Sequence, residues 1–342
     1  MLRIGIAGFG FMGRTHYQCW SKLKAAKVVA ICDTNPNIVE DTKKTVGNIG
    51  DAQSNIDFGK LKLYADYGKM LAEAKLDAVS ITLPTCLHPE FSIKALSAGV
   101  NVMCEKPMAL TVRECDKMIA AAKSSGRRLQ IGHCVRFWPE YAKTKQIVDS
   151  GKYGKVIAAS FRRLGSVPTW SIDDWFLDEQ RSGGMALDLH IHDSDYVQYL
   201  FGMPKAVASF GAKAPGGGLV HIVTQYIYDD ARVITAEGGW AMMPAFGFEM
   251  SFNIMLEKAT ILYDLTRKPM FRVCPAKGDA FTPEVEKGDG WFLQIAHFAK
   301  LIAGKKLKPV TTLEQSRDSV RIVAAEKESV GKGKKIAIDL ES

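Results

Sequence analysis

The chain has 342 residues and a formal net charge of +8, a length that suggests two domains at about 100–200 residues each. Its 47% hydrophobic and 24% charged residues are typical of a globular protein, and its apolar runs fall well short of the ~18 residues of a membrane span. The lysines are scattered, without the basic stripe of a nucleic-acid-binding protein. Composition therefore argues against membrane and nucleic-acid partners.

Cysteine usage and the N-terminus indicate a cytoplasmic protein. The seven cysteines are an odd number without a Cys-x-x-Cys pair, which argues against a disulfide framework and against a cysteine zinc site. Residues 1–7 lead directly into a glycine turn and lack the features of a secretory signal. We therefore expect a cytoplasmic location.

Strand and helix patterns alternate through the first 134 residues. Apolar runs predict strands at 2–7, 28–32, near Tyr64, 78–82, 100–104 and 129–132. Helical patterns lie between them at 12–24, 35–46, 67–74, 89–98 and 112–124. Strands that alternate with helices predict a doubly wound parallel sheet covered on both faces, in an α/β fold.

The pattern changes after residue 135. A helix near 141–150 precedes a strand at 156–163, an irregular segment at 165–184 and a helix at 185–201. Strand patterns then fill 207–273, and apolar residues at every second position predict one strand over 246–256. Helices at 290–303 and 313–330 follow. The C-terminal part is therefore predicted to form an α+β domain.

The segment Gly8–Gly13 matches the pattern G-x-G-x-x-G between a predicted strand and a predicted helix. In such a turn the first glycine permits the tight bend, the second lets the backbone approach a pyrophosphate, and the third lets helix and strand pack closely. The helix N-terminus then offers N–H groups to the phosphates. We predict a dinucleotide site here; the alternative is a glycine turn without a ligand.

Asp33 indicates which dinucleotide is bound. It ends the second predicted strand, 20 residues after Gly13 (33 − 13), where an acidic residue binds the ribose 2′-OH. A carboxylate repels a 2′-phosphate, and Thr34 and Asn35 follow without a basic residue to hold one. NAD is therefore predicted rather than NADP, although Asp33 is also suited to capping the next helix.

Lys106 is a candidate for proton transfer. Glu105-Lys106-Pro107 follows a predicted strand, and ligands bind at the carboxyl ends of strands in open α/β sheets. A lysine beside a nicotinamide cation has a lowered pKa, which suits proton transfer. The alternative is a surface lysine after a strand.

Asp188 and His192 are four residues apart in a predicted helix, so both lie on one face, with Asp195 near it. Neighbouring acids orient and tune an imidazole. One alternative is a surface pair; another is a metal site with His190, His88 or His133. Zinc sites need three or four convergent ligands with recognisable spacing, so we expect no metal.

His88 follows Pro84-Thr85-Cys86-Leu87 at a predicted strand-to-helix turn. Its position is compatible with a contact to the nicotinamide ribose. It is equally compatible with a cap on the following helix.

Together these segments resemble the glucose-fructose oxidoreductase / inositol dehydrogenase (Gfo/Idh/MocA) family over nearly the whole chain. The similar segments are Gly8–Gly13, Thr82-Leu83-Pro84 through His88, Ala95–Gly99, Glu105-Lys106-Pro107, Gly183-Gly184 followed by Asp188-x-x-x-His192, and Ile302–Lys305 to Pro309–Thr311. Within Gly132–Phe137, His133 and Val135 depart from the commonest family residues.

The resemblance implies a fold and a set of site residues. It implies an N-terminal Rossmann domain at 1–134, a domain with an open, mainly antiparallel sheet at 135–312, and a C-terminal helix and tail at 313–342 that packs on the first domain. The implied catalytic set is Lys106, Asp188 and His192. Implied cofactor contacts are Gly8, Phe9, Gly10, Phe11, Met12, Asp33, Thr34, Thr82, Leu83, Pro84, His88, Glu105 and Lys106. The candidate substrate contacts are His133, Arg136 and Trp175.

The leading hypothesis is an NAD-dependent dehydrogenase of a sugar, cyclitol or related polyol. Hydride passes between a carbinol carbon and nicotinamide, Lys106 or His192 takes the hydroxyl proton, and Asp188 orients His192. Two alternatives on the same fold are an NAD-dependent glycosidase acting by transient oxidation and a non-catalytic NAD-sensing regulator.

The hypothesis also predicts where the substrate binds and how the chain assembles. The substrate is expected between the domains, with Arg136 and the segment from Trp170 to Trp175 as walls. The resemblance further implies a homo-oligomer, a dimer or tetramer, through the C-terminal sheet.

Overall fold

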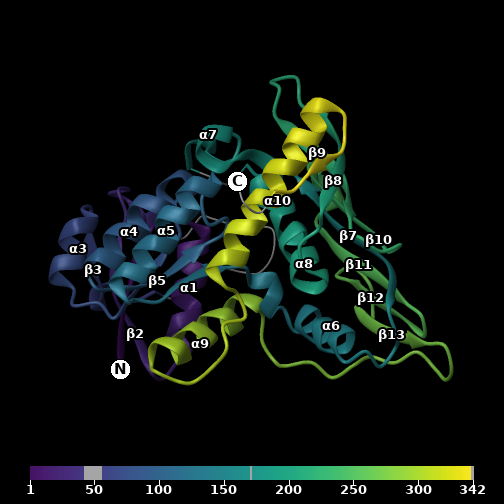
Figure 1. The fold of residues 1–342 in the computed structure, drawn as a ribbon. Helices are drawn as coiled ribbons and strands as arrows, with labels where there is room; N and C mark the ends of the chain where they lie inside the picture. Colours follow the sequence, from purple (N-terminus) through teal and green to yellow (C-terminus); the bar gives the residue numbers. More distant parts are fainter. Residues whose placement is uncertain (42–55, 170–171, 340–342) are drawn as a thin grey trace. The chain divides into compact units, whose positions relative to one another are not determined.

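A computed structural model of the protein describes residues 1–41, 56–169 and 172–339. Contacts group the chain into two units. The first comprises the described residues of Met1–Cys134, Trp170–Trp175 and Asp289–Arg317; the second comprises those of Val135–Thr169, Phe176–Gly288 and Asp318–Ser342. Each unit contains one sheet (Figure 1).

The first sheet has six strands in the order β3-β2-β1-β4-β5-β6, and all neighbouring pairs are parallel. Its strands are β1 Leu2–Ala7, β2 Ala26–Cys32, β3 Lys62–Tyr64, β4 Ala78–Ile81, β5 Asn101–Glu105 and β6 Leu129–Gly132. The chain order reverses between β1 and β4, so the carboxyl ends of these strands form the switch point at which such sheets bind ligands. The predicted parallel Rossmann sheet is confirmed.

Helices of the first unit pack on its sheet. They are α1 Phe11–Ser21, α2 Ile38–Asp41, α3 Tyr67–Glu73, α4 His88–Ser97, α5 Val112–Ser125 and α9 Gly290–Ile302. α1 packs against α9, and α4 packs against α5 (Figure 1). The core between α1, α9 and the sheet is apolar, and Trp20 and Phe298 meet edge to face with ring centroids 6.3 Å apart. The helix predicted at 35–46 is described only as α2; residues 42–46 lie outside the described part.

The second sheet has eight strands in the order β13-β12-β11-β7-β10-β9-β8-β14. They are β7 Val156–Ser166, β8 Ala206–Lys213, β9 Leu219–Ile227, β10 Val233–Met242, β11 Glu249–Leu256, β12 Ala259–Asp264, β13 Phe271–Pro275 and β14 Ile336–Ala337. Only the β7–β10 pairing in this sheet is parallel. The predicted, mainly antiparallel C-terminal sheet is confirmed.

The helices of the second unit include α6 Pro139–Asp149, α7 Glu179–Ser182 and α8 Ile191–Phe201, and most of α10 Leu313–Lys332. The helix predicted at 185–201 has two parts, because Ala186–His190 is a π-helix that precedes α8. π-Helical turns inside helices are rare and are frequent at functional sites. This turn carries Asp188.

The structure gives different bounds for one predicted strand, and its two contact units differ from the predicted domain bounds. The strand predicted over 246–256 begins at Glu249, because Pro244–Phe246 forms a 3-10 turn and Gly247, with a φ of +80°, ends it. Residues 289–312 were placed with the second domain, but Asp289–Arg317 group with the first unit. Residues 313–342 were expected to pack on the first domain. Residues 313–317 group with the first unit and the described residues from Asp318 onward with the second, where β14 pairs with β8, so this packing stays a prediction.

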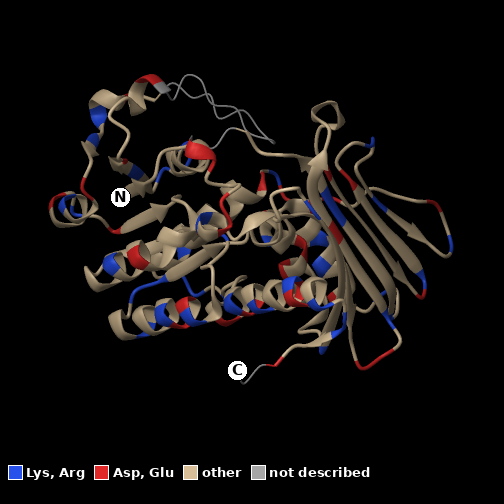
Figure 2. Cartoon of the chain, turned by 90° about the horizontal axis from the view of Figure 1, so that it is seen from above, with Lys and Arg blue, Asp and Glu red and all other residues tan. Residues whose placement is uncertain are grey.

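Basic and acidic residues are interspersed along the helices and strands (Figure 2). Among the described residues, no helix is long and apolar enough to cross a membrane.

Candidate cofactor and catalytic site

The glycine turn after β1 has the geometry of a phosphate-binding turn. Gly8 has a φ of +83°, and a Cβ atom there would lie 2.7 Å from the Thr82 carbonyl oxygen. A Cβ atom at Gly13 would overlap the Gly8 carbonyl oxygen, whereas one at Gly10 would meet nothing within 4 Å. The first and third glycines are therefore required by close packing, and the second leaves its side of the turn open for a ligand.

Gly10 is also the N-cap of α1 and makes no side-chain capping hydrogen bond. Phe11 and Met12 follow as the first residues of the helix. The backbone N–H groups of this first turn are suited to a pyrophosphate, and the helix dipole favours an anion there.

Asp33 is fixed at the edge of this turn. One carboxylate oxygen accepts a hydrogen bond from the Phe9 N–H at 2.7 Å, and the other accepts one from the Asn35 N–H at 2.9 Å. Each oxygen can accept a further hydrogen bond, which suits a ribose hydroxyl. The alternative of a cap on the next helix is not what the structure shows, because α2 begins only at Ile38.

A small cavity of about 170 Å³ adjoins Asp33. Its other lining residues are Ile31, Asn35, Pro36, Ile38, Leu63, Tyr64 and Ala65. The cavity lies at the ends of β2 and β3, beside the carboxylate that would hold the ribose.

The residues that follow β4 pack against the glycine turn. The Thr82 hydroxyl donates to the Gly8 carbonyl oxygen at 2.6 Å and lies 3.1 Å from the Ala7 carbonyl oxygen. A Cβ atom at Gly8 would lie 2.9 Å from the Leu83 side chain. Thr82 and Leu83 therefore form the floor of the turn, and their contact with the cofactor stays a prediction.

His88 is buried between two backbone segments. Its side chain is 1% exposed, and its ring nitrogens lie 2.8 Å from the Pro107 carbonyl oxygen and 2.9 Å from the Leu83 carbonyl oxygen. The ring therefore connects the segments that follow β4 and β5. It is not a side-chain cap of α4, whose N-cap residue is Leu87, and its contact with a nicotinamide ribose stays a prediction. Burial lowers the pKa of His88, against the two carbonyl oxygens, which act to raise it.

Glu105 is directed into the first unit, and its contact with a cofactor stays a prediction. It is 6% exposed, and one carboxylate oxygen lies 2.9 Å from Nε2 of the fully buried His16. Burial acts to raise the pKa of Glu105, but hydrogen bonding to His16 and nearby positive charge outweigh it and lower the pKa. Space for this carboxylate comes from Gly132, where a Cβ atom would lie 2.8 Å from Oε1.

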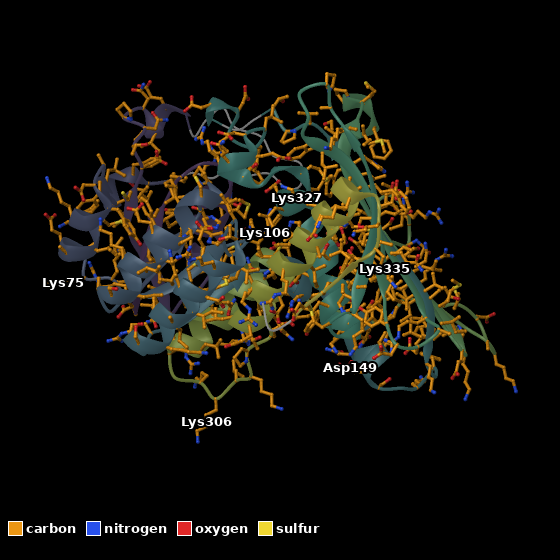
Figure 3. The ribbon with its side chains drawn as sticks, turned by 45° about the horizontal axis from the view of Figure 1, so that its top comes forward. Lys75, Lys106, Asp149, Lys306, Lys327 and Lys335 are labelled. Atoms are coloured by element: carbon orange, nitrogen blue, oxygen red, sulfur yellow. The ribbon has the colours of Figure 1, made fainter. Side chains whose placement is uncertain are left out.

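Lys106 follows β5 at the same sheet edge as the glycine turn, since β1, β4 and β5 are parallel neighbours. It is partly buried and lies toward the middle of the view, whereas Lys75 and Lys306 extend from the surface (Figure 3). The first unit thus brings together the open phosphate-binding turn, Asp33 and a lysine.

Asp188 and His192 lie on the exposed part of an otherwise buried segment. From Ser182 to Gln198 only Asp188, Leu189 and His192 are partly exposed, and every other residue is buried. Asp188 lies within the π-helix and His192 in the first turn of α8. Asp188 and His192, which were predicted to belong to the proton-transfer set, are therefore the polar residues of this segment that are partly exposed.

Neighbouring polar residues of this segment face inward. Nε2 of His190 lies 3.6 Å from Oε2 of Glu326, with both side chains fully buried. A side chain at Gly238 of β10 would overlap the His190 ring. Asp195, which was expected near the face of His192, receives two hydrogen bonds of 2.8 Å from Arg136. Within the described residues, no group of three or more His, Cys, Asp or Glu side chains is arranged to hold a metal ion.

The candidate substrate residues have different settings. Arg136 is buried in the bidentate pair with Asp195, and its guanidinium lies 4.6 Å from the centre of the Tyr199 ring. His133 is 1% exposed, whereas Trp175 is partly exposed. Trp170 lies outside the described residues. Contact of Arg136, His133 and Trp175 with substrate stays a prediction.

Sequence patterns did not indicate the partners of these residues. His16 and Glu105 are separated by 89 positions, and Arg136 and Asp195 by 59. No local periodicity connects residues at such distances. For His16 and Glu105 the only sequence signal is their place in the chain. His16 lies in the helix that begins at the glycine turn, and Glu105 ends a strand of the same sheet.

Comparison with known proteins adds independent information. The model of the oxidoreductase family with an NAD-binding Rossmann fold (GFO_IDH_MocA) matches residues 2–133, and that of the GFO/IDH/MocA C-terminal domain matches residues 141–262. Together these matches span most of both units.

Full-length relatives show the same similarity. The chain is 27% identical over 350 residues to an uncharacterized oxidoreductase, YrbE, of Bacillus subtilis, covering 98% of this chain and 96% of that protein. It is 29% identical over 271 residues to inositol 2-dehydrogenase of Azotobacter vinelandii, covering 71% and 74%. The crystal structure of myo-inositol 2-dehydrogenase from Lactobacillus plantarum matches with a TM-score of 0.80 and 27% identity, over 99% of both chains.

Proposed function

Because the chain belongs to the Gfo/Idh/MocA family of oxidoreductases, we propose that it is an NAD-dependent dehydrogenase of a sugar, cyclitol or related polyol. One observation carries this proposal. The open glycine turn and Lys106 lie at the same carboxyl edge of one parallel sheet. A dinucleotide bound there has a proton-transfer group on the unit that holds it.

The cofactor assignment rests on the turn and on Asp33. Gly8–Met12 would hold the pyrophosphate and Asp33 the ribose hydroxyls, so NAD is proposed over NADP. NAD would supply the hydride acceptor, which is the redox chemistry that side chains cannot perform. Thr34, Pro84, Glu105 and His88 remain proposed members of the site, and the structure favours an indirect role for the last two.

The remaining chemistry belongs to side chains. Oxidation of a carbinol removes a hydride from carbon and a proton from oxygen. Lys106 or His192 would take that proton, and Asp188 would orient the imidazole and accept a hydrogen bond from the substrate. The partly exposed Asp188 and His192 in a buried segment support this assignment.

The substrate class is inferred from relatives. Two of the matched proteins are named as inositol 2-dehydrogenases, and a cyclitol offers the secondary hydroxyl that this chemistry requires. We therefore propose a cyclitol or sugar, with Trp175 as a candidate wall for its ring.

A panel of cyclitols and sugars tests the function. The purified protein is incubated with NAD and each compound, and NADH absorbance is followed. Growth of NADH with one compound class supports the dehydrogenase. Hydrolysis of a glycoside without net NADH indicates the glycosidase alternative, and NAD binding with neither reaction indicates the regulator.

A homo-oligomer through the second sheet and a cytoplasmic location also remain proposals. Exposed apolar residues on two paired strands support the first: Phe210 of β8 is 74% exposed, and its cross-strand neighbour Val223 of β9 is 40% exposed. Apolar groups adjacent on a sheet favour burial against a partner. Light scattering coupled to gel filtration measures the assembly.

A further inference from the structure

Two buried histidines contact the segment that carries Lys106, and the proposed reaction assigns no role to either. His88 belongs to α4 and His16 to α1, and both lie in the first unit with Lys106. Their exposed fractions are 1% and 0%. Buried polar side chains are retained where they are hydrogen-bonded, and each has a specific partner here.

His88 holds the segment after Lys106. Its Nδ1 lies 2.8 Å from the Pro107 carbonyl oxygen, and its Nε2 lies 2.9 Å from the Leu83 carbonyl oxygen. Proline has no backbone N–H, so its carbonyl oxygen is the backbone atom through which Pro107 can be hydrogen-bonded. The ring thereby fixes the spacing between the Lys106 segment and the floor of the glycine turn.

His16 holds the same segment from its other side. Oε1 of Glu105 accepts a hydrogen bond from Nε2 of His16 at 2.9 Å. Oε2 of Glu105 accepts one from the backbone N–H of Lys106 at 3.3 Å. One carboxylate therefore connects the backbone of Lys106 to helix α1, whose N-terminus adjoins the glycine turn. His16 therefore contacts Glu105, the residue before Lys106, and His88 contacts Pro107, the residue after it.

We propose that His88, His16 and Glu105 are positioning residues. Together they set Lys106 at the proton-transfer distance from a substrate. This inference rests on the proposed function, because it requires Lys106 to be the group that acts. None of these three residues needs to touch substrate or cofactor. A displacement of a reacting group by about 1 Å can lower turnover about 100-fold, so loosening the segment is expected to affect turnover more than NAD binding.

Two conservative variants of His88 separate its two contacts. The amide nitrogen of asparagine is attached where Nδ1 is in histidine, and that of glutamine extends to the position of Nε2. His88→Asn therefore keeps a donor for Pro107, and His88→Gln keeps one for Leu83. A neutral imidazole carries one N–H, so His88 donates to only one of the two carbonyl oxygens. The inference requires that this is the Pro107 oxygen, and the two variants test that choice.

The test combines turnover, NAD affinity and hydrogen exchange. We expect His88→Gln to lower kcat about 10–100-fold and His88→Asn to lower it less, with NAD Kd within about threefold in both. Exchange of the peptide covering 105–110, followed by mass spectrometry, should be faster in His88→Gln than in His88→Asn. His297→Gln is the matched control, because Nε2 of His297 also lies near a backbone carbonyl oxygen, that of Lys308 at 3.2 Å.

A double-mutant cycle with Lys106→Ala decides whether His88 acts through Lys106. Residues that act through one group give non-additive effects, so His88→Gln should have no further effect on kcat once Lys106 is alanine. Additive losses, equal losses in the asparagine and glutamine variants, or a loosened segment with unchanged kcat would overturn the inference. Full activity of Lys106→Ala alone would instead remove the proposed function of Lys106, and the positioning role with it.

Discussion

Alanine at Gly10 should weaken NAD binding without lowering stability, whereas alanine at Gly13 should lower stability, although both glycines belong to one turn. A Cβ atom at Gly10 meets nothing within 4 Å, and the φ of −67° at this position is ordinary for alanine. Gly10→Ala is therefore expected to leave the free energy of unfolding unchanged or to raise it by about 0.4–1 kcal/mol, because alanine restricts the unfolded chain.

Gly13 is in a different position. Alanine there gains about 1 kcal/mol of helix propensity in α1, but its Cβ atom would overlap the Gly8 carbonyl oxygen. Backbone cannot move aside as a flexible side chain does, and such overpacking lowers stability by about 1–3 kcal/mol. The net expectation for Gly13→Ala is a loss of up to about 2 kcal/mol and a lower Tm.

Thermal unfolding and isothermal titration with NAD measure the two effects. Gly10→Ala should keep its Tm and weaken NAD binding at least about tenfold, or 1.4 kcal/mol, since the new methyl group occupies the side from which the pyrophosphate approaches. Unchanged NAD affinity of a folded Gly10→Ala would show that the pyrophosphate binds elsewhere. A Gly13→Ala variant as stable as the unmodified protein would refute the packing argument.

Three further predictions concern charged groups. Asp33→Ala should narrow the preference for NAD over NADP in titrations, and equal affinity of the unmodified protein for both would contradict the assignment of Asp33. Lys106→Ala or His192→Ala should lower turnover by about 10²–10⁴, with little change in NAD Kd for His192→Ala; full turnover of both variants would remove the proton-transfer set. The pKa of Glu105 is lowered from 4.5 in the folded chain, so its stabilising contribution is present above that pH and is lost as the pH falls through the folded-state value. The Tm difference between the unmodified protein and Glu105→Gln should therefore shrink on acidification, and a difference that is constant with pH would contradict this.

Local sequence patterns predicted the elements whose signals are local. The glycine turn, the alternation of strands and helices and the change after residue 135 all appear in the structure, because burial imposes the period of each element on its own residues. The strand over 246–256 was placed too early, since Gly247 interrupts the extended chain at a point where the apolar alternation continues.

Other features have no local signal. A π-helical turn adds one residue to a helix, and a period of 3.6 in 185–201 does not indicate where that residue is. Asp195 was expected to lie near the face of His192 on the basis of helical spacing, but its bidentate pair with Arg136 is set by tertiary structure. Glu105 was predicted to contact the cofactor because of its local motif. The sequence did not indicate its hydrogen-bond partner, His16, which lies 89 positions earlier.

The most direct test of the account is the yield of NADH. With the cyclitol or sugar that the panel identifies, the unmodified protein should form one NADH for each carbonyl product, and Lys106→Ala and His192→Ala should form it at least about 100-fold more slowly while still binding NAD. An unmodified protein that binds NAD but forms no NADH with any cyclitol or sugar, or variants that form it at the full rate, would contradict the proposed dehydrogenase.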